Sequence, residues 1–218
     1  MKKAAVILSG SGVFDGAEIQ ESVITLLALD RAGVEVEMFA PDINQYHVIN
    51  HLTGKETGET RNVLIESARI ARGNIKDILE ADISKFDVIV FPGGFGVAKN
   101  FCNLAFKGKD CVVEPILEEF IIKAISEKKP LGFICIAPAL LAKVASKIGL
   151  KLSITIGDDE DTAKIIEEFG SVHINCPVND IAYDEKNRIV TAPAYMLGKN
   201  ISEVAQGIEK LVLKLMDI

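Results

Sequence analysis

The sequence predicts a single α/β domain in which helices cover both faces of a mostly parallel sheet. Short runs rich in β-branched residues alternate with longer segments of helical periodicity, and this alternation is typical of a parallel sheet between two layers of helices. The chain has 218 residues, of which 49% are hydrophobic and 25% charged, and this balance suits one domain with a substantial core. No linker or low-complexity segment divides the chain, so we expect residues 1–218 to form one domain.

The first half of the chain alternates two strands with two helices. The predicted elements are a strand at Ala4–Leu8, a helix at Asp15–Arg31, a strand at Val34–Phe39 and a helix at Thr60–Arg72. Pro41 ends the second strand, because proline cannot donate to a sheet ladder. A polar loop that contains His47 and His51 precedes the second helix.

The second half is more hydrophobic and supplies the central strands. The predicted elements are a strand at Phe86–Phe91, a helix at Cys111–Lys128, a strand at Leu131–Ile134, a helix at Ala137–Ile148, strands at Leu152–Ile156 and Val172–Asn175 with a helix at Asp159–Phe169 between them, and a closing helix at Asn200–Met216. Strands at Ile181–Tyr183 and Arg188–Thr191 flank the turn residues 184–187, and this pattern predicts a hairpin.

Charge and composition exclude several classes of function. The net charge is −7 and no basic stripe is present, which argues against nucleic acid or an anionic membrane as a partner. The apolar stretch Ala4–Leu8 is too short for a signal-peptide core or a membrane span, so we expect a cytoplasmic protein. Four cysteines without CxxC spacing predict neither a structural zinc site nor a disulfide framework, and we expect no metal and no cofactor.

Cys135 is the residue that most strongly indicates chemistry. The apolar strand Leu131–Ile134 runs directly into it, and a helix follows within a few residues, with Pro138 in its first turn. A nucleophile at such a turn is exposed at the carboxyl edge of the sheet, and the helix N-terminus is expected to favour the thiolate and lower the thiol pKa. The alternative is a buried structural cysteine, which is how we interpret the other three cysteines.

Two glycines near Cys135 are candidates for an oxyanion hole. Gly93 and Gly94 end the neighbouring predicted strand, where backbone N–H groups can point into a site without hindrance from side chains. Either of them, together with the amide of Ile136, would stabilise the negative oxygen that forms when a thiolate attacks a carbonyl. An ordinary strand-ending turn explains the same residues equally well.

Glu18 is the candidate acid near the thiol. It lies on the first turn of the helix after the first strand, where a carboxylic acid beside a thiolate can shuttle a proton. Asp15 and Glu18 also form a capping-box pattern, in which Glu18 only binds backbone, and Glu21 is a second candidate one turn on. The glycines of residues 9–18 do not fit the dinucleotide pattern G-x-G-x-x-G, so we do not expect a nucleotide site there.

Several blocks along the whole chain are similar to ElbB-type proteins of the ThiJ/PfpI superfamily. These blocks are Val6–Gly10, Phe39–Asp42, Asn50–Gly54, Glu59–Glu66, Pro92–Asn100, Cys135–Pro138, Cys176–Asp180 and Pro193–Leu197. The resemblance implies a flavodoxin-like three-layer sandwich with a class I glutamine-amidotransferase-like domain, often a homodimer. It also implies that Cys135 is the nucleophile and Glu18 its acidic partner.

The resemblance implies an enzyme, a glutathione-independent glyoxalase of the lyase type that acts on a small 2-oxoaldehyde. Cys135 would attack glyoxal, or methylglyoxal, Glu18 would move a proton between the two former carbonyl carbons, and hydrolysis of the thioester would release a 2-hydroxy acid. Many amidotransferases and hydrolases of the superfamily carry His after the Cys, whereas this chain has Ile136, which argues against those two activities. The alternative is a non-catalytic redox-sensing or regulatory protein linked to isoprenoid metabolism, in which Cys135 is oxidised.

Overall fold

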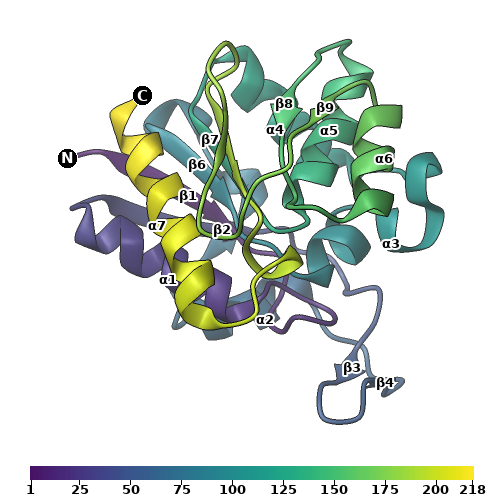
Figure 1. Ribbon diagram of the computed structural model, residues 1–218. Helices are drawn as coiled ribbons and strands as arrows, with labels where there is room; N and C mark the ends of the chain where they lie inside the picture. The colour runs from purple at the N-terminus through teal and green to yellow at the C-terminus, as the bar shows by residue number, and fades with distance from the viewer.

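The computed structural model describes the whole chain, residues 1–218, and confirms the predicted three-layer α/β sandwich. Its central sheet has seven strands in the order β10-β11-β7-β6-β1-β2-β5 (Figure 1). Their bounds are β1 Lys3–Ile7, β2 Glu35–Ala40, β5 Lys76–Asp77, β6 Val88–Phe91, β7 Leu131–Ile134, β10 Ala182–Asp184 and β11 Ile189–Ala192. All neighbouring pairs are parallel except β10 and β11, which form the predicted hairpin.

Helices cover both faces of this sheet. On one face lie α1 (Ile19–Arg31) and α7 (Ile201–Asp217), and on the other α4 (Pro115–Ser126) and α5 (Ala137–Lys147) (Figure 1). Successive residues of β1 alternate between the two cores, with Ala4 and Val6 on the α1–α7 side and Ala5 and Ile7 on the other. Because both faces are covered, the central strands are apolar throughout, and this is why the sequence shows them as continuous hydrophobic runs.

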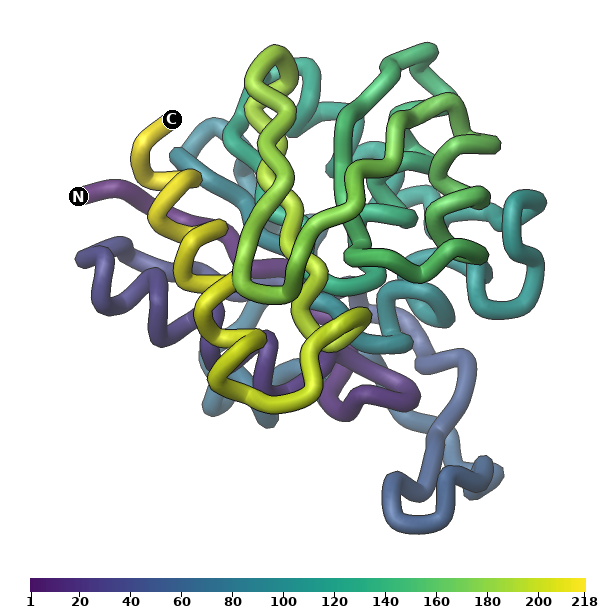
Figure 2. Tube along the Cα trace, viewed as in Figure 1, coloured from purple at the N-terminus to yellow at the C-terminus, as the bar shows by residue number.

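Shorter elements surround this framework. They are α2 (Val63–Ile70), α3 (Leu104–Lys107), α6 (Glu160–Glu168), the two-stranded sheets β3–β4 (Ile49–Asn50, Lys55–Glu56) and β8–β9 (Ser153–Ile154, Val172–His173), a π-helix η3 (Val97–Phe101), and 3₁₀ turns η1 (Ile78–Glu80), η2 (Ile83–Lys85), η4 (Gly108–Asp110) and η5 (Ala194–Met196). The β3–β4 hairpin projects from the body of the molecule (Figure 2). None of the helices is both long enough and apolar enough to cross a bilayer.

Several predicted boundaries were wrong. The first helix begins at Ile19 rather than Asp15, because the side chain of Glu18 caps it. The helix predicted from Cys111 begins at Pro115, and residues 111–114 are extended instead. The two strands predicted at 152–156 and 172–175 are shorter and pair with each other rather than with the main sheet. The edge strand β5 and the β3–β4 hairpin were not predicted.

Candidate active site

Cys135 lies at the carboxyl end of β7, in the turn that leads into α5. Its backbone adopts φ = 62°, a left-handed conformation that non-glycine residues rarely hold, and its N–H donates to Ala192 O at 2.9 Å. Strain of this kind marks the sharp strand-to-helix turns on which nucleophiles are mounted. The side chain is 7% exposed. The structure therefore places Cys135 at the sheet edge, where the strand–Cys–helix pattern indicated. The prediction of an exposed side chain was wrong, because Gly93 and Glu21 pack closely against it.

Glu21 is the acid that reaches the thiol. It lies on the first turn of α1 and is completely buried. Its carboxyl group lies next to the Cys135 sulfur, since a Cβ placed on Gly93 would be 2.6 Å from Glu21 Oε2 and 3.0 Å from Cys135 Sγ, and each group shifts the pKa of the other. Its Oε2 also accepts from Gly93 N at 3.0 Å, and its Oε1 from Tyr195 N at 3.1 Å. Two backbone N–H groups from different loops thus fix the orientation of the carboxyl group against the sulfur.

Burial keeps both members of this pair protonated. It raises the pKa of Glu21 to about 8, and it raises the pKa of the Cys135 thiol well above its usual range, with the charge of Glu21 adding to the effect. The amides of Gly94 and Ile136 point at the sulfur and oppose this shift. The predicted lowering of the thiol pKa was therefore wrong, because burial and an acidic neighbour outweigh the helix N-terminus.

The two glycines after β6 have different roles. A Cβ on Gly93 would lie 2.3 Å from the Cβ of Cys135, so only glycine allows this close approach, and its N–H is used by Glu21. Gly94 adopts φ = +102° and directs its N–H toward the sulfur. Of the predicted oxyanion-hole residues, Gly94 and Ile136 thus direct their amides to the Cys135 sulfur, whereas the amide of Gly93 donates to the Glu21 carboxyl.

Glu18 lies beside the thiol but is engaged elsewhere. Its Oε2 accepts from Glu21 N at 2.6 Å, so it is the N-cap of α1. It is half-buried, which raises its pKa, while hydrogen bonds from the amides of Glu21 and Gln20 oppose the increase. Its side chain also lines the cavity above Cys135. The cap interpretation thus describes its contacts, although its partner is Glu21 N rather than the backbone of Asp15.

A cavity of about 270 Å³ opens at the sulfur of Cys135. Apolar walls and two carboxylates form it, and its lining is Val13, Glu18, Gly94, Phe95, Cys135, Ile136, Asp159, Thr162, Tyr195 and Met196. Asp159 caps α6 through Thr162 N at 2.8 Å, and this hydrogen bonding lowers the pKa of its carboxyl. No local sequence pattern predicts that Asp159, Thr162 and Tyr195 line this cavity, because only tertiary packing brings their segments to this edge.

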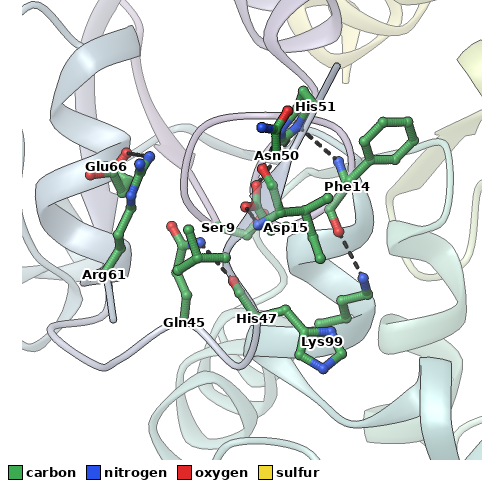
Figure 3. A network of polar contacts seen from close by, with 12 residues as sticks. Ser9, Phe14, Asp15, Gln45, His47, Asn50, His51, Arg61, Glu66 and Lys99 are labelled. Carbon is green, nitrogen blue, oxygen red and sulfur yellow. Dashed lines mark hydrogen bonds and ion pairs between the residues drawn. The ribbon is translucent and has the colours of Figure 1, made fainter. Parts of the chain in front are cut away.

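The loop of residues 9–16 forms one side of this site and is held from outside by the β3–β4 hairpin (Figure 3). His51 Nε2 accepts from Phe14 N at 3.2 Å, and Asp15 Oδ2 accepts from Ile49 N at 2.6 Å. Lys99 Nζ donates to Phe14 O at 2.8 Å. A Cβ on Gly12 would lie 2.5 Å from His51 Nε2, so the glycine accommodates the histidine ring.

No histidine lines the cavity at Cys135, and no group of three His, Cys, Asp or Glu side chains is arranged to bind a metal. His173 Nε2 accepts from Ile156 N at 3.2 Å on the short β8–β9 sheet. The chemistry available to the site is therefore a thiol, a buried carboxylic acid in contact with it, and two backbone amides aimed at the same atom.

No family model matches the chain. It is 40% identical over 226 residues to the human glutamine amidotransferase-like class 1 domain-containing protein 3, mitochondrial, with 99% of this chain and 83% of that protein covered. The rat ES1 protein homolog, mitochondrial, is 39% identical, with 99% and 84% covered. The zebrafish ES1 protein, mitochondrial, is 30% identical, with 88% and 76% covered.

Solved structures confirm the fold. A crystal structure of an isoprenoid biosynthesis protein with an amidotransferase-like domain from Ehrlichia chaffeensis has a TM-score of 0.93 and 40% identity, with 100% of this chain and 99% of that chain covered. A DJ-1 superfamily protein from Salmonella typhimurium, solved as a cysteine-to-alanine mutant, has a TM-score of 0.58 and 22% identity, with 100% and 91% covered. The second likeness shows the fold alone.

These relatives correct the expected location. All three curated relatives are named as mitochondrial proteins, which overturns the prediction of a cytoplasmic protein. The prediction rested on the length of the apolar stretch Ala4–Leu8, which tests for a secretory signal or a membrane span and carries no information about a mitochondrial address.

Proposed function

We propose that this chain, which belongs to the family of ES1 proteins and glutamine amidotransferase-like class 1 domain proteins, is a cofactor-independent glyoxalase that uses Cys135 as its nucleophile. The observation that carries the proposal is the contact between the Cys135 thiol and the buried Glu21 carboxyl group at the base of the cavity. A thiol and a carboxylic acid in contact supply the two functions that the conversion of an aldehyde needs, a nucleophile and a proton carrier.

The first step forms a bond between Cys135 and an aldehyde carbon of glyoxal. The carboxylate form of Glu21 accepts the thiol proton as the sulfur attacks, so the thiolate need not exist free in the apolar site. The oxygen of the attacked carbonyl becomes negative, and the amides of Gly94 and Ile136 donate to it. The proton then passes from Glu21 to this oxygen, and the product is a hemithioacetal.

The second stage moves a proton between the two carbons. Glu21 removes the hydrogen of the hemithioacetal carbon, and the electron pair shifts toward the neighbouring carbonyl oxygen to give an enediolate. Glu21 returns this proton to the neighbouring carbon, the hydroxyl proton of the first carbon passes to the alkoxide oxygen, and the product is a thioester of hydroxyacetic acid. Water then attacks the thioester, the C–S bond breaks, and glycolate and the Cys135 thiol are released. In sum, glyoxal and water become glycolic acid, and no oxidant, reductant or cofactor is consumed.

Glu21 replaces Glu18 as the proton carrier in this proposal. The Glu21 carboxyl group lies next to the Cys135 sulfur, whereas Glu18 Oε2 accepts a hydrogen bond from Glu21 N. Glu18 lies at the cavity wall and, together with Asp159, makes the opening acidic. This charge favours neutral carbonyl compounds such as glyoxal and methylglyoxal over anionic 2-oxo acids.

The test is product formation by purified protein that has been treated with a chelator and freed of small thiols. Wild type is expected to convert glyoxal stoichiometrically to glycolate, measured by NMR, and Cys135→Ser is expected to lose at least about 10³-fold in kcat/KM. Cys176→Ser is the matched control, because Cys176 is equally buried but remote from Glu21. Loss of glyoxal without glycolate, or full turnover by Cys135→Ser, would show that the protein has another function.

A further inference from the structure

Two further cysteines, Cys102 and Cys111, lie close together after η3. The chain after η3 runs antiparallel to residues 111–114, and Cys102 pairs with Val113 in an isolated β-bridge. Hydrogen bonds from Asn103 N to Val112 O at 3.1 Å and from Glu114 N to Phe101 O at 2.8 Å hold the two segments together. Between the two segments lie α3 and the turn η4.

The alternation along this segment turns both sulfurs to the same side. Val112 is 61% exposed, whereas Cys111 and Val113 on either side of it are buried. In an antiparallel pair, the residue two positions from the direct partner is the diagonal neighbour on the same face. Cys111 is therefore the diagonal neighbour of Cys102, and the two thiols are close enough to form a side-chain hydrogen bond.

We propose that Cys102 and Cys111 form a redox-active dithiol that hydrogen peroxide oxidises to an intramolecular disulfide, independently of Cys135. Access exists from the surface, since Cys102 lines a cavity of about 280 Å³ that also includes Tyr46 and Lys99. Cys111 lies directly between the exposed residues Asp110 and Val112. Peroxide is small enough to reach thiols in such a position. The Cys102 thiol donates a hydrogen bond to Val97 O at 3.3 Å, and neither Cys102 nor Cys111 lines the cavity at Cys135.

The two thiols have different roles in the oxidation. Hydrogen bonding from Cys102 lowers the pKa of Cys111 to about 7, and the positive charge of Lys143 on α5 acts in the same direction. The pKa of Cys102 is raised well above its usual range by Cys111 and by burial. Cys111 therefore carries the thiolate near neutral pH, and Cys102 remains the thiol that resolves the intermediate.

The reaction balances with peroxide as the only co-reactant. The Cys111 thiolate attacks one oxygen of hydrogen peroxide, the O–O bond breaks, and hydroxide leaves, so that Cys111 becomes a sulfenic acid. The sulfur of Cys102 then attacks the sulfenic sulfur, loses its proton, and displaces a second hydroxide. The two thiols have lost two electrons and two protons, and one peroxide has become two waters.

Formation of the S–S bond requires a small closure of the loop between the cysteines. Disulfides need Cα atoms about 4.4–6.8 Å apart, whereas diagonal neighbours in a sheet lie at about 7–8 Å. Residues 105–107, 109 and 110 are exposed, so the closure breaks surface contacts rather than core packing. These contacts are the stacking of Phe106 on Tyr46 and the hydrogen bond from Lys143 Nζ to Lys109 O.

The experiment treats the reduced full-length protein with limiting hydrogen peroxide at pH 7 and maps its peptides without reduction. A cross-linked pair of peptides that contains Cys102 and Cys111, with a mass lower by two hydrogens, is expected to form at least about tenfold faster than any oxidation of Cys135. The Cys135→Ser variant should give the same cross-link at the same rate, which separates this site from the active site.

Two further variants test the assigned roles. Cys102→Ser should accumulate a sulfenic acid at Cys111 that dimedone traps, because the resolving thiol is gone, and Cys176→Ser should behave as wild type. Circular dichroism checks that each variant is folded, and the wild-type map decides the question even if a variant is not. Oxidation of Cys135 or Cys176 ahead of the pair, or conversion of wild-type Cys111 to sulfinic acid with Cys102 still a thiol, would overturn the proposal.

Discussion

The two cysteine sites of this molecule show how the neighbours of a buried thiol decide its protonation. Cys135 lies at the N-terminus of α5 and has two backbone amides aimed at its sulfur, yet its pKa is raised by burial and by Glu21. Cys111 lies at the end of an exposed loop, yet its pKa is lowered to about 7 by hydrogen bonding with Cys102 and by the charge of Lys143. Cys135, which the sequence pattern indicates as the reactive thiol, therefore keeps its proton, whereas Cys111, for which no pattern predicts reactivity, loses its proton near neutral pH.

The difference follows from the sign of the partner's charge and the depth of burial. A carboxyl group beside a thiol penalises the thiolate, and removal from water penalises it again, so two amide donors do not compensate. A second thiol that keeps its own proton donates to the thiolate, and a lysine stabilises it further. A helix N-terminus is thus only one contribution to a thiol pKa, and at Cys135 it is not the largest.

The largest effect that separates the two sites is expected from Glu21→Gln. Without the proton carrier, turnover of glyoxal should fall by about 10²–10⁴-fold. The pKa of Cys135 should also fall, because the charge that opposes its thiolate is removed, and the pH midpoint of its alkylation should move downward. Alkylation of Cys111 should keep its midpoint, since Glu21 is not among the groups that set its pKa.

Glu66→Gln is the matched control for this variant. Glu66 is also a buried glutamate on a helix, but it pairs with Arg69 at 2.9 Å on α2. Its replacement should alter neither the turnover nor the alkylation of Cys135. An unchanged turnover in Glu21→Gln would remove the acid–thiol pair from the proposed mechanism.

The sequence predicted the parts of the site that depend on neighbouring residues. The turn at Cys135 follows from an apolar strand that ends at a cysteine and a proline that begins a helix. Residues adjacent in the sequence are therefore enough to predict this turn. The sequence could not decide whether Glu18 or Glu21 faces the thiol, because this depends on which residue caps α1. If α1 began three residues later, Glu21 would be the capping residue instead of the buried one.

Contacts between distant segments were equally hidden. Asp159 reaches the cavity because α6 packs against α5, and Tyr195 N reaches Glu21 from a loop 174 positions away. The proximity of Cys102 and Cys111 could not be predicted from their spacing. The sequence predicts a helix from Cys111, whereas in the structure this helix begins at Pro115 and residues 111–114 are extended beside Cys102. Local patterns therefore predict the nucleophile, and the tertiary fold supplies its partners.

Gly93→Ala should disturb the first site and leave the second one intact. The new Cβ would lie 2.3 Å from the Cβ of Cys135 and 2.6 Å from Glu21 Oε2, so the turn and the carboxyl must separate. We expect a loss of about 1–3 kcal/mol in the free energy of unfolding. Displacement of the reacting groups should also cost about 10²-fold in turnover.

The control is Gly149→Ala, where a Cβ meets nothing within 4 Å and only backbone strain is added. Denaturant unfolding and glyoxal turnover measure the two effects, and the oxidation of Cys102 and Cys111 should be normal in both variants. Retention of full turnover in Gly93→Ala would show that the close approach of β6 and β7 is not needed for the chemistry.

The pH dependence of stability should reveal the proton on Glu21. The folded protein holds this proton up to about pH 8, whereas the unfolded chain releases it near 4.5. Between these values the folded state binds more protons, so the stabilisation from Glu21 is complete below pH 4.5 and is lost as the pH rises toward 8. The loss amounts to at most about 1.4 kcal/mol per pH unit, and Glu21→Gln should abolish it.

Turnover should change in the opposite direction over the same range. The carboxylate form of Glu21 accepts the thiol proton, so kcat should rise with pH and level off above about 8. Urea unfolding and glyoxal kinetics on the same samples from pH 5 to 9 measure both curves. A turnover that is flat across pH 8 would mean that another group limits the reaction.

The smallest effect is expected from Glu18→Gln, and it decides between the two acids of the first site. Glu18 Oε2 caps α1 through Glu21 N, and glutamine keeps an acceptor oxygen at this position, so the free energy of unfolding should fall by no more than about 1 kcal/mol. The pKa of Cys135 is set by burial, Glu21 and two amides, so its alkylation should keep its midpoint. Turnover of glyoxal should change by less than about tenfold, because the residue lines the cavity without contacting the sulfur. If Glu18→Gln instead loses as much turnover as Glu21→Gln while its fold and cap survive, Glu18 is the proton carrier that the family resemblance implied, and Glu21 serves to hold the thiol protonated.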